Sequence, residues 1–229
     1  SEVDIERSIG SVNIYGSVQT NEECKLRILL SHNKENIHEA NVDVETFNKS
    51  GKVISGFQVE LWQPNLCGSQ FLYDLEVQLT TKSEGILDIW KNRIGFKQIE
   101  WLSCDGAPAE ADKWICSING KPTFLQGFNW TPVLPNYADV TYAHYRRYLE
   151  IYKQLGCNIL RVWGGATLEH ESFYDICDEL GILIWQEFPL SSSGLDNHPP
   201  QHKEAIDEMA NIAKSFIERR QHHVSLLLW

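Results

Sequence analysis

In the first hundred residues, apolar and polar positions alternate in short runs that recur about every ten residues. Leu26, Ile28 and Leu30, for example, alternate with polar neighbours. A period of two is typical of a strand with one buried and one exposed face. We therefore expect an immunoglobulin-like antiparallel β-sandwich over residues 1–100. Its expected strands are Val12–Tyr15, Leu26–Ser31, Val42–Phe47, Val53–Glu60, Leu72–Leu79 and Ile86–Trp90.

A different pattern marks residues 158–189, which predict a strand, a helix and a second strand. The apolar positions at helical spacing are Phe173, Ile176, Cys177 and Leu180. Gly181 follows them, where the end of a helix favours a left-handed residue. Ile182–Trp185 is an apolar run too short for a helix, and it fits a strand buried on both faces. This segment is therefore a βαβ unit.

The same pattern extends to both sides of this unit. Residues 99–113 show no periodicity and mark the predicted boundary between domains 1–100 and 101–229. Before the βαβ unit we expect a hairpin turning at Asn119-Gly120, a strand at Gly127–Trp130 and a helix starting after Asp139 or Thr141. After the unit we expect a polar loop at 191–200, a helix around Ala205–Ile217 and a strand at Val224–Trp229. The order β-α-β-α-β-α-β predicts a parallel sheet with right-handed crossovers. Periodicity alone fits either half of a (β/α)8 barrel or a small doubly wound sheet.

Charge narrows the classes of partner. The net charge of −11 and the pI near 5.2 argue against binding to nucleic acid or to an anionic membrane surface. No stretch approaches the roughly 20 apolar residues that a membrane helix needs. We therefore expect neither a nucleic-acid partner nor a membrane partner.

Candidate chemistry gathers at the carboxyl ends of the parallel strands, where α/β folds place their sites. The residues that end the first three strands are Asn129, Trp130, Arg161, Trp163, Gln186 and Glu187. Aromatic rings beside these polar groups suit a carbohydrate, because a sugar packs its apolar face on a ring and its hydroxyls need polar partners. The alternatives are core packing for the two tryptophans and a structural ion pair between Arg161 and Glu187.

The sequence gives little support for nucleotide binding, metal-dependent hydrolysis or acyl transfer. Gly164-Gly165 lacks the GxGxxG spacing of a nucleotide-binding loop, and no HExxH, GxSxG or Cys–His arrangement is present. His222 and His223 stand in the turn before the last strand, where we expect surface or capping residues rather than metal ligands. We expect no cofactor and no metal.

Several motifs resemble glycoside hydrolase family 2, in particular its β-mannosidase-like members. The motifs, in the family's order, are LWQPNLCGSQFLYDLEVQL (61–79), RIGFKQIEW (93–101), SINGKPTFLQG (117–127), GFNWTP (127–132), LRVWGG (160–165) and FYDICDELGILIWQEFP (173–189). The resemblance implies an immunoglobulin-like domain followed by the first four strands of a (β/α)8 TIM barrel. Glu187 stands where many β-mannosidases have Asp.

The resemblance also implies a retaining exo-β-glycosidase that hydrolyses terminal β-linked sugars, most specifically β-mannosides. Two glutamates are expected to act, about 5–5.5 Å apart across the sugar. In the family they follow the fourth strand and a much later one, so we expect both after Trp229 and an inactive isolated chain. The implied substrate-binding residues are Asn129, Trp130, Arg161, Trp163 and Glu187.

Two alternatives stay open at this point. One is a non-catalytic carbohydrate-binding or interaction module, and the other is an unrelated open α/β domain fused to a sandwich. Half of a barrel would also expose strand edges and an apolar interior, which favours self-association. We therefore expect two kinds of partner: a second copy of the chain, bound through this edge, and a carbohydrate substrate.

Overall fold

The chain forms two compact units in the computed structural model, which describes residues 1–83, 85–165, 168–190 and 200–229. One unit comprises residues 1–62 and 71–98, and the other comprises residues 63–70 and 99–229. Except for Pro200, the polar loop predicted for 191–200 lies outside the described residues.

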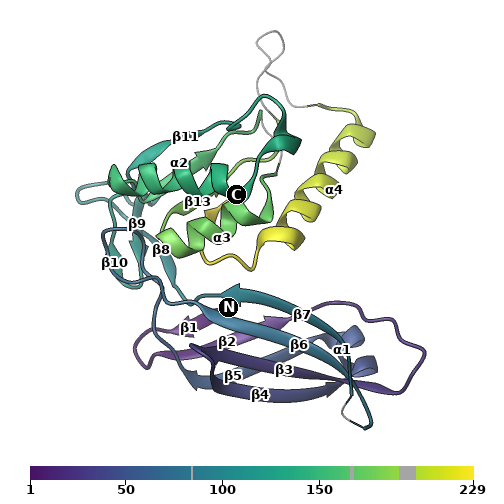
Figure 1. The fold of residues 1–229 in the computed structure, drawn as a ribbon. Helices are drawn as coiled ribbons and strands as arrows, with labels where there is room; N and C mark the ends of the chain where they lie inside the picture. The colour runs from purple at the N-terminus through teal and green to yellow at the C-terminus, as the bar shows by residue number, and fades with distance from the viewer. Residues whose placement is uncertain (84, 166–167, 191–199) are drawn as a thin grey trace. The chain divides into compact units, whose positions relative to one another are not determined.

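The first unit is an antiparallel β-sandwich, as the alternating pattern predicts (Figure 1). One sheet has the order β1-β2-β5 and the other the order β4-β3-β6-β7. The strands are β1 Glu2–Asp4, β2 Ile9–Ile14, β3 Cys24–His32, β4 Glu35–Asp43, β5 Lys52–Gln58, β6 Tyr73–Thr81 and β7 Ile86–Ile94. Alternate residues of both sheets meet in one core, among them Val12 and Phe57 from one sheet and Ile28 and Leu75 from the other.

One strand prediction in this unit is wrong. Val42–Phe47 was expected to be a strand, but β4 ends at Asp43 and helix α1, Val44–Ser50, follows. Glu45 in the first turn and Lys49 in the last turn suit the two ends of a helix dipole. Gly51, at φ +67°, then donates its N–H to the carbonyl of Phe47 at 2.7 Å. These local signals outweigh the alternation of the valines.

The second unit contains a four-stranded parallel sheet in the order β11-β12-β13-β14. Its elements are β11 Gly127–Trp130, the 3-10 turn η1 Tyr137–Asp139, α2 Tyr142–Gln154, β12 Ile159–Val162, α3 Glu171–Leu180, β13 Leu183–Gln186, α4 Lys203–Arg220 and β14 Leu226–Leu228. The predicted β-α-β-α-β-α-β order is confirmed. None of the described helices is long and apolar enough to cross a membrane.

Local signals set the boundaries of these elements. Thr141 caps α2 by accepting a hydrogen bond from the backbone of His144, and Gly181 ends α3 in the left-handed conformation. Asn119 and Gly120, both at positive φ, turn the predicted hairpin between β9, Ile115–Ile118, and β10, Lys121–Pro122. Residues 99–113 are not entirely loop, because β8, Ile99–Leu102, pairs with β9.

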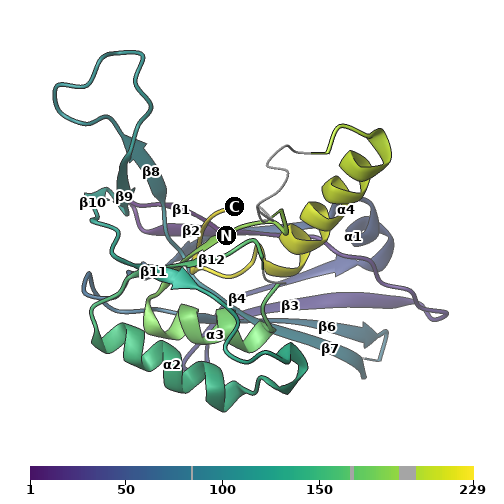
Figure 2. The same ribbon diagram turned by 90° about the horizontal axis from the view of Figure 1, so that it is seen from above.

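Helices α2 and α3 lie side by side against one face of the parallel sheet (Figures 1 and 2). The core between them is built from Trp130, Tyr145, Leu149, Leu160, Val162, Phe173, Ile176, Cys177 and Ile184. The opposite face carries side chains that the helices do not cover, and the candidate site lies among these.

Candidate carbohydrate site at the strand ends

A row of three residues crosses three neighbouring strands near their carboxyl ends. Asn129 of β11 is in register with Arg161 of β12, and Arg161 is in register with Trp185 of β13. Because successive residues of a strand point to opposite faces, residues in register share one face. The row therefore places an amide, a guanidinium and an indole together.

Arg161 is the centre of this row. Its Nη1 donates a hydrogen bond to Oδ1 of Asn129 at 3.1 Å, and its guanidinium lies 5.3 Å from the ring centroid of Trp185. Its Nε donates to Oε1 of Glu187 at 2.8 Å, and its Nη2 donates to the same oxygen. These bonds employ three of the five N–H groups of the guanidinium and fix its orientation, and the other two have no acceptor among the described residues.

Glu187 follows β13 and accepts bonds on both oxygens. Oε1 takes the two bonds from Arg161, and Oε2 accepts the backbone N–H of Gly164 at 2.8 Å. A carboxylate offers about four acceptor positions, so one position on Oε2 is unused within the described part of the chain. The structural ion pair considered in the sequence analysis is therefore present.

The two glycines after β12 lack a Cβ and so allow the backbone to lie close to Glu187, Phe188 and Trp163. A Cβ on Gly164 would lie 2.7 Å from the carbonyl oxygen of Phe188 and 3.1 Å from Oε2 of Glu187. A Cβ on Gly165 would lie 2.0 Å from the ring of Trp163, which is 39% exposed. The Trp-Gly-Gly sequence thus presents a partly exposed indole directly after β12, and the backbone of Gly164 lies against Glu187.

Trp130 faces the helices and is 2% exposed. Its indole packs on Tyr145 and Phe173, and its Nε1 donates to Oε1 of Glu169 at 3.1 Å. The hydroxyl of Tyr145 donates to Oε2 of Glu169 at 2.5 Å. Burial raises the pKa of the Glu169 carboxyl, and the two hydrogen bonds oppose this only in part. Trp130 therefore stands behind the exposed row, held by a buried carboxylate.

The sequence analysis did not select two residues that belong to this arrangement. Trp185 is 39% exposed and lies against Arg161. Which face of the sheet it occupies depends on the register of β13 with β12, and a continuous apolar run does not reveal that register. Glu169 lies in the loop before α3, where no motif pointed to it. Gln186, by contrast, is directed away from the row and accepts a hydrogen bond from the hydroxyl of Tyr174 at 2.6 Å.

A second polar cluster lies where α3 meets the turn between α4 and β14. His223 was expected to be a surface or capping residue, but it is 3% exposed. Its Nδ1 lies 2.7 Å from Oδ2 of Asp178, and its Nε2 lies 3.1 Å from Oε1 of Glu171. Burial alone would lower the pKa of the imidazole, but the two carboxylates outweigh it and raise the pKa to about 9. Helical periodicity did not show that Asp178 would face this turn.

Fold and site together define a class: a β-sandwich followed by a parallel β/α unit whose strand ends carry polar and aromatic groups. The model for "Glycosyl hydrolases family 2" matches residues 3–97. A β-mannosidase of Bos taurus is 33% identical over 187 residues, which are 81% of this chain and 20% of that protein. A mannosylglycoprotein endo-β-mannosidase of Lilium longiflorum is 29% identical over 177 residues, which are 76% of this chain and 18% of that protein. The chain thus spans about a fifth of the length of these curated relatives.

Solved structures show the same likeness. The β-D-mannosidase of Dictyoglomus thermophilum superimposes with a TM-score of 0.77 at 25% identity, covering 97% of this chain and 29% of that one. A Parabacteroides merdae β-glucuronidase has a TM-score of 0.74 at 20% identity, covering 100% and 28%, a likeness of fold alone. The chain belongs to glycosyl hydrolase family 2 and is β-mannosidase-like.

Proposed function

We propose that this chain is part of a retaining exo-β-glycosidase that hydrolyses terminal β-mannosides. The observation that carries the proposal is the row of Asn129, Arg161 and Trp185, with Glu187 and Trp163 beside it. It joins hydrogen-bonding groups to exposed aromatic rings, as a sugar subsite requires. Relatives named β-mannosidase over most of the chain's length support the choice of sugar.

We also propose an architecture of an immunoglobulin-like domain over residues 1–100 and the first half of a (β/α)8 barrel over residues 101–229. The four parallel strands are then the first four of eight, and the face with Arg161 is the barrel interior. This places Asn129, Arg161 and Glu187 at the end of the barrel where such enzymes hold their sites.

Each residue has a role in this proposal. Arg161 directs its two remaining N–H groups at the nucleophile carboxylate, which we expect from a strand after Trp229. Asn129 and Glu187 bind sugar hydroxyls, and Trp163 is the exposed wall of the subsite. Trp130 was expected to wall the subsite too, but its indole is buried on the helix side against Phe173, and its carbonyl accepts the backbone N–H of Trp163 at 3.1 Å.

The chemistry itself requires groups outside residues 1–229. One glutamate would attack the anomeric carbon as another protonates the leaving oxygen, and water would then displace the enzyme from the sugar. We expect both glutamates after Trp229, so the isolated chain should be inactive. Arg161 contributes by fixing the position and charge of the nucleophile in a dry site.

The experiment is a hydrolysis assay of the complete protein that contains this chain, with aryl β-mannoside, β-glucuronide and β-galactoside as substrates. Proton NMR of the first product shows its anomeric configuration. We expect β-mannoside to be the best substrate and the first product to be the β-anomer. A best substrate of another sugar class, or release of the α-anomer, would contradict the proposal.

The alternative, a non-catalytic carbohydrate-binding module, makes a different prediction for the chain alone. It requires sugar binding that needs no further strands. Calorimetric titration of residues 1–229 with mannobiose separates the two: measurable heat of binding at millimolar sugar favours the module, and its absence favours a subsite that needs the rest of the enzyme.

A further inference from the structure

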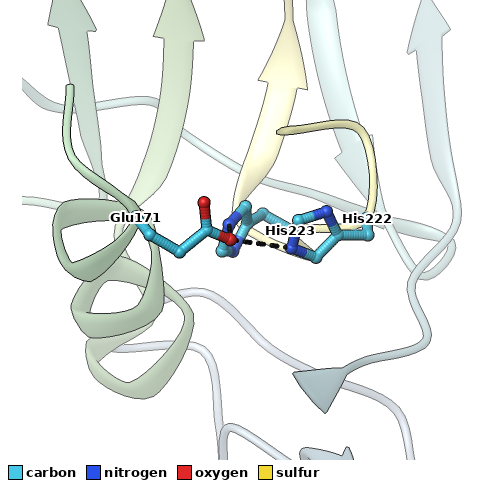
Figure 3. A group of neighbouring side chains, drawn as sticks. All are labelled: Glu171, His222 and His223. Carbon is cyan, nitrogen blue, oxygen red and sulfur yellow. Dashed lines mark hydrogen bonds and ion pairs between the residues drawn. The ribbon is translucent and has the colours of Figure 1, made fainter. Parts of the chain in front are cut away.

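Three possible ligand atoms converge where α3 begins and α4 ends. Oε1 of Glu171 lies 3.2 Å from Nε2 of His222 and 3.1 Å from Nε2 of His223, and all three atoms lie within 4.8 Å of one another (Figure 3). Ligand atoms held about 2.0–2.1 Å from a tetrahedral Zn²⁺ lie roughly 3.3 Å apart. The two separations from Glu171 therefore already match those of a zinc coordination shell.

A carboxylate behind one imidazole fixes its orientation. Oδ2 of Asp178 lies 2.7 Å from Nδ1 of His223 and accepts the proton there, so Nε2, 3.1 Å from Oε1 of Glu171, is the nitrogen that would bind an ion once the ion has displaced its proton. This is the carboxylate–histidine–metal arrangement that orients metal-binding imidazoles in proteins. Asp178 also accepts the backbone N–H of Ser225 at 2.7 Å through its other oxygen, so the support is itself fixed.

The charges in the cluster favour a divalent cation. Asp175, Asp178 and Glu171 supply three carboxylates around the two imidazoles, and the guanidinium of Arg220 pairs with the second oxygen of Glu171. Once an ion has displaced the Nε2 protons and both imidazoles are neutral, these groups carry two net negative charges. One divalent ion balances them, whereas without it two histidine N–H groups must share a single carboxylate oxygen.

The cluster is open on one side. The side chain of His223 is fully buried, while those of His222 and Glu171 are 22% and 45% exposed. An ion can therefore enter from the side of Glu171 and keep a water as its fourth ligand. Two imidazoles and one carboxylate are a donor set that suits Zn²⁺ rather than Mg²⁺ or Ca²⁺, which prefer oxygen.

We propose that Glu171, His222 and His223 form a zinc site that ties the first turn of α3 to the turn leading into β14. The inference is independent of the glycosidase proposal, because it concerns a cluster on the helical side of the sheet. The ion would stabilise the position of β14, the last described strand of the sheet.

The test uses the 1–229 chain freed of metal with EDTA, with Zn²⁺ alone as the ligand. We expect one equivalent to bind in competition with a chelating dye, and the zinc X-ray absorption spectrum to show two imidazole ligands. At a zinc concentration about 100 times the dissociation constant, the melting temperature should rise by roughly 5 °C or more.

His222→Ala removes one ligand and leaves the bond between Asp178 and His223 intact, so we expect zinc affinity to fall at least about tenfold. His202→Ala, in the exposed turn before α4, is the matched control and should bind zinc as the wild type does. Equal affinity of the wild type and His222→Ala would overturn the site. A spectrum with fewer than two imidazoles would overturn it as well, and this measurement does not depend on any variant folding.

Discussion

Arg161 and Glu187 lie 26 residues apart in the chain, and a single carboxylate oxygen of Glu187, Oε1, accepts hydrogen bonds from both Nε and Nη2 of the Arg161 guanidinium. The other oxygen, Oε2, binds the backbone of Gly164. One carboxylate therefore connects the ends of β12 and β13 and sets the direction in which the guanidinium points.

Replacing Glu187 by Gln should remove the negative charge and weaken the hydrogen bonds that connect the ends of β12 and β13. Nε2 of the amide cannot accept a bond, so either Arg161 or Gly164 loses its partner. We expect a loss of about 1–3 kcal/mol in the free energy of unfolding, measured by urea denaturation of the 1–229 chain. Asp207→Asn breaks the exposed pair with Lys203 and should cost less than about 0.5 kcal/mol. Equal effects of the two variants would show that the Arg161–Glu187 pair is merely a surface contact.

A methyl group on Gly165 should displace the ring of Trp163. The added Cβ would lie 2.0 Å from that ring, closer than any real contact, so the indole must rotate away. We expect a changed near-ultraviolet circular dichroism spectrum with nearly unchanged secondary structure. Gly16→Ala is a suitable control, since its Cβ would make an ordinary 3.4 Å contact with Phe47. An unchanged spectrum in Gly165→Ala would contradict the described position of Trp163.

The buried carboxyl of Glu169 should make stability depend on pH. Its folded-state pKa is raised, chiefly by burial, so its contribution to stability is fully present below the ordinary glutamate pKa of about 4.3. That contribution is lost as the pH rises from there through the raised pKa. Urea denaturation from pH 4 upward should show it: the unfolding free energy of the wild type minus that of Glu169→Gln should fall with rising pH. A difference that grows with pH would mean that the pKa is lowered instead.

The 1–229 chain should self-associate through the outer edge of β11. Among the described strands, β11 pairs with β12 alone, and Phe128 within it is 57% exposed. Multi-angle light scattering should give a mass above that of one chain, and Phe128→Lys should lower it. Phe124→Lys, at a more exposed phenylalanine outside the strand, should leave the mass unchanged. A monomeric wild type at micromolar concentration would contradict this prediction.

Much of the fold was predictable because many helix ends and turns are set by residues that are close together in the sequence. The Asn119-Gly120 turn, the Thr141 cap and Gly181 at the end of α3 each act within a few residues, and the structure contains all three. The prediction failed at 44–47, because the alternation of Val42 and Val44 continues into the first residue of the helix that Gly51 ends.

The candidate site was predictable only in part. Strand ends could be located, so Asn129, Arg161 and Glu187 were expected near one another, and the structure brings the three side chains together. The row that joins Arg161 to Trp185 depends on register between strands far apart in the sequence. The burial of His223 likewise depends on Asp178 of another element, and no spacing along the chain reveals that contact.

The most direct test of the central claim is the steady-state hydrolysis of an aryl β-mannoside by the complete protein with Arg161→Lys. Lysine keeps the charge but cannot reproduce the planar contacts to Glu187 and Asn129. We expect kcat/KM to fall about 10²–10³-fold, with Arg147→Lys on the exposed face of α2 close to the wild type. An Arg161→Lys enzyme within twofold of the wild type would contradict the proposal that this row forms the sugar subsite.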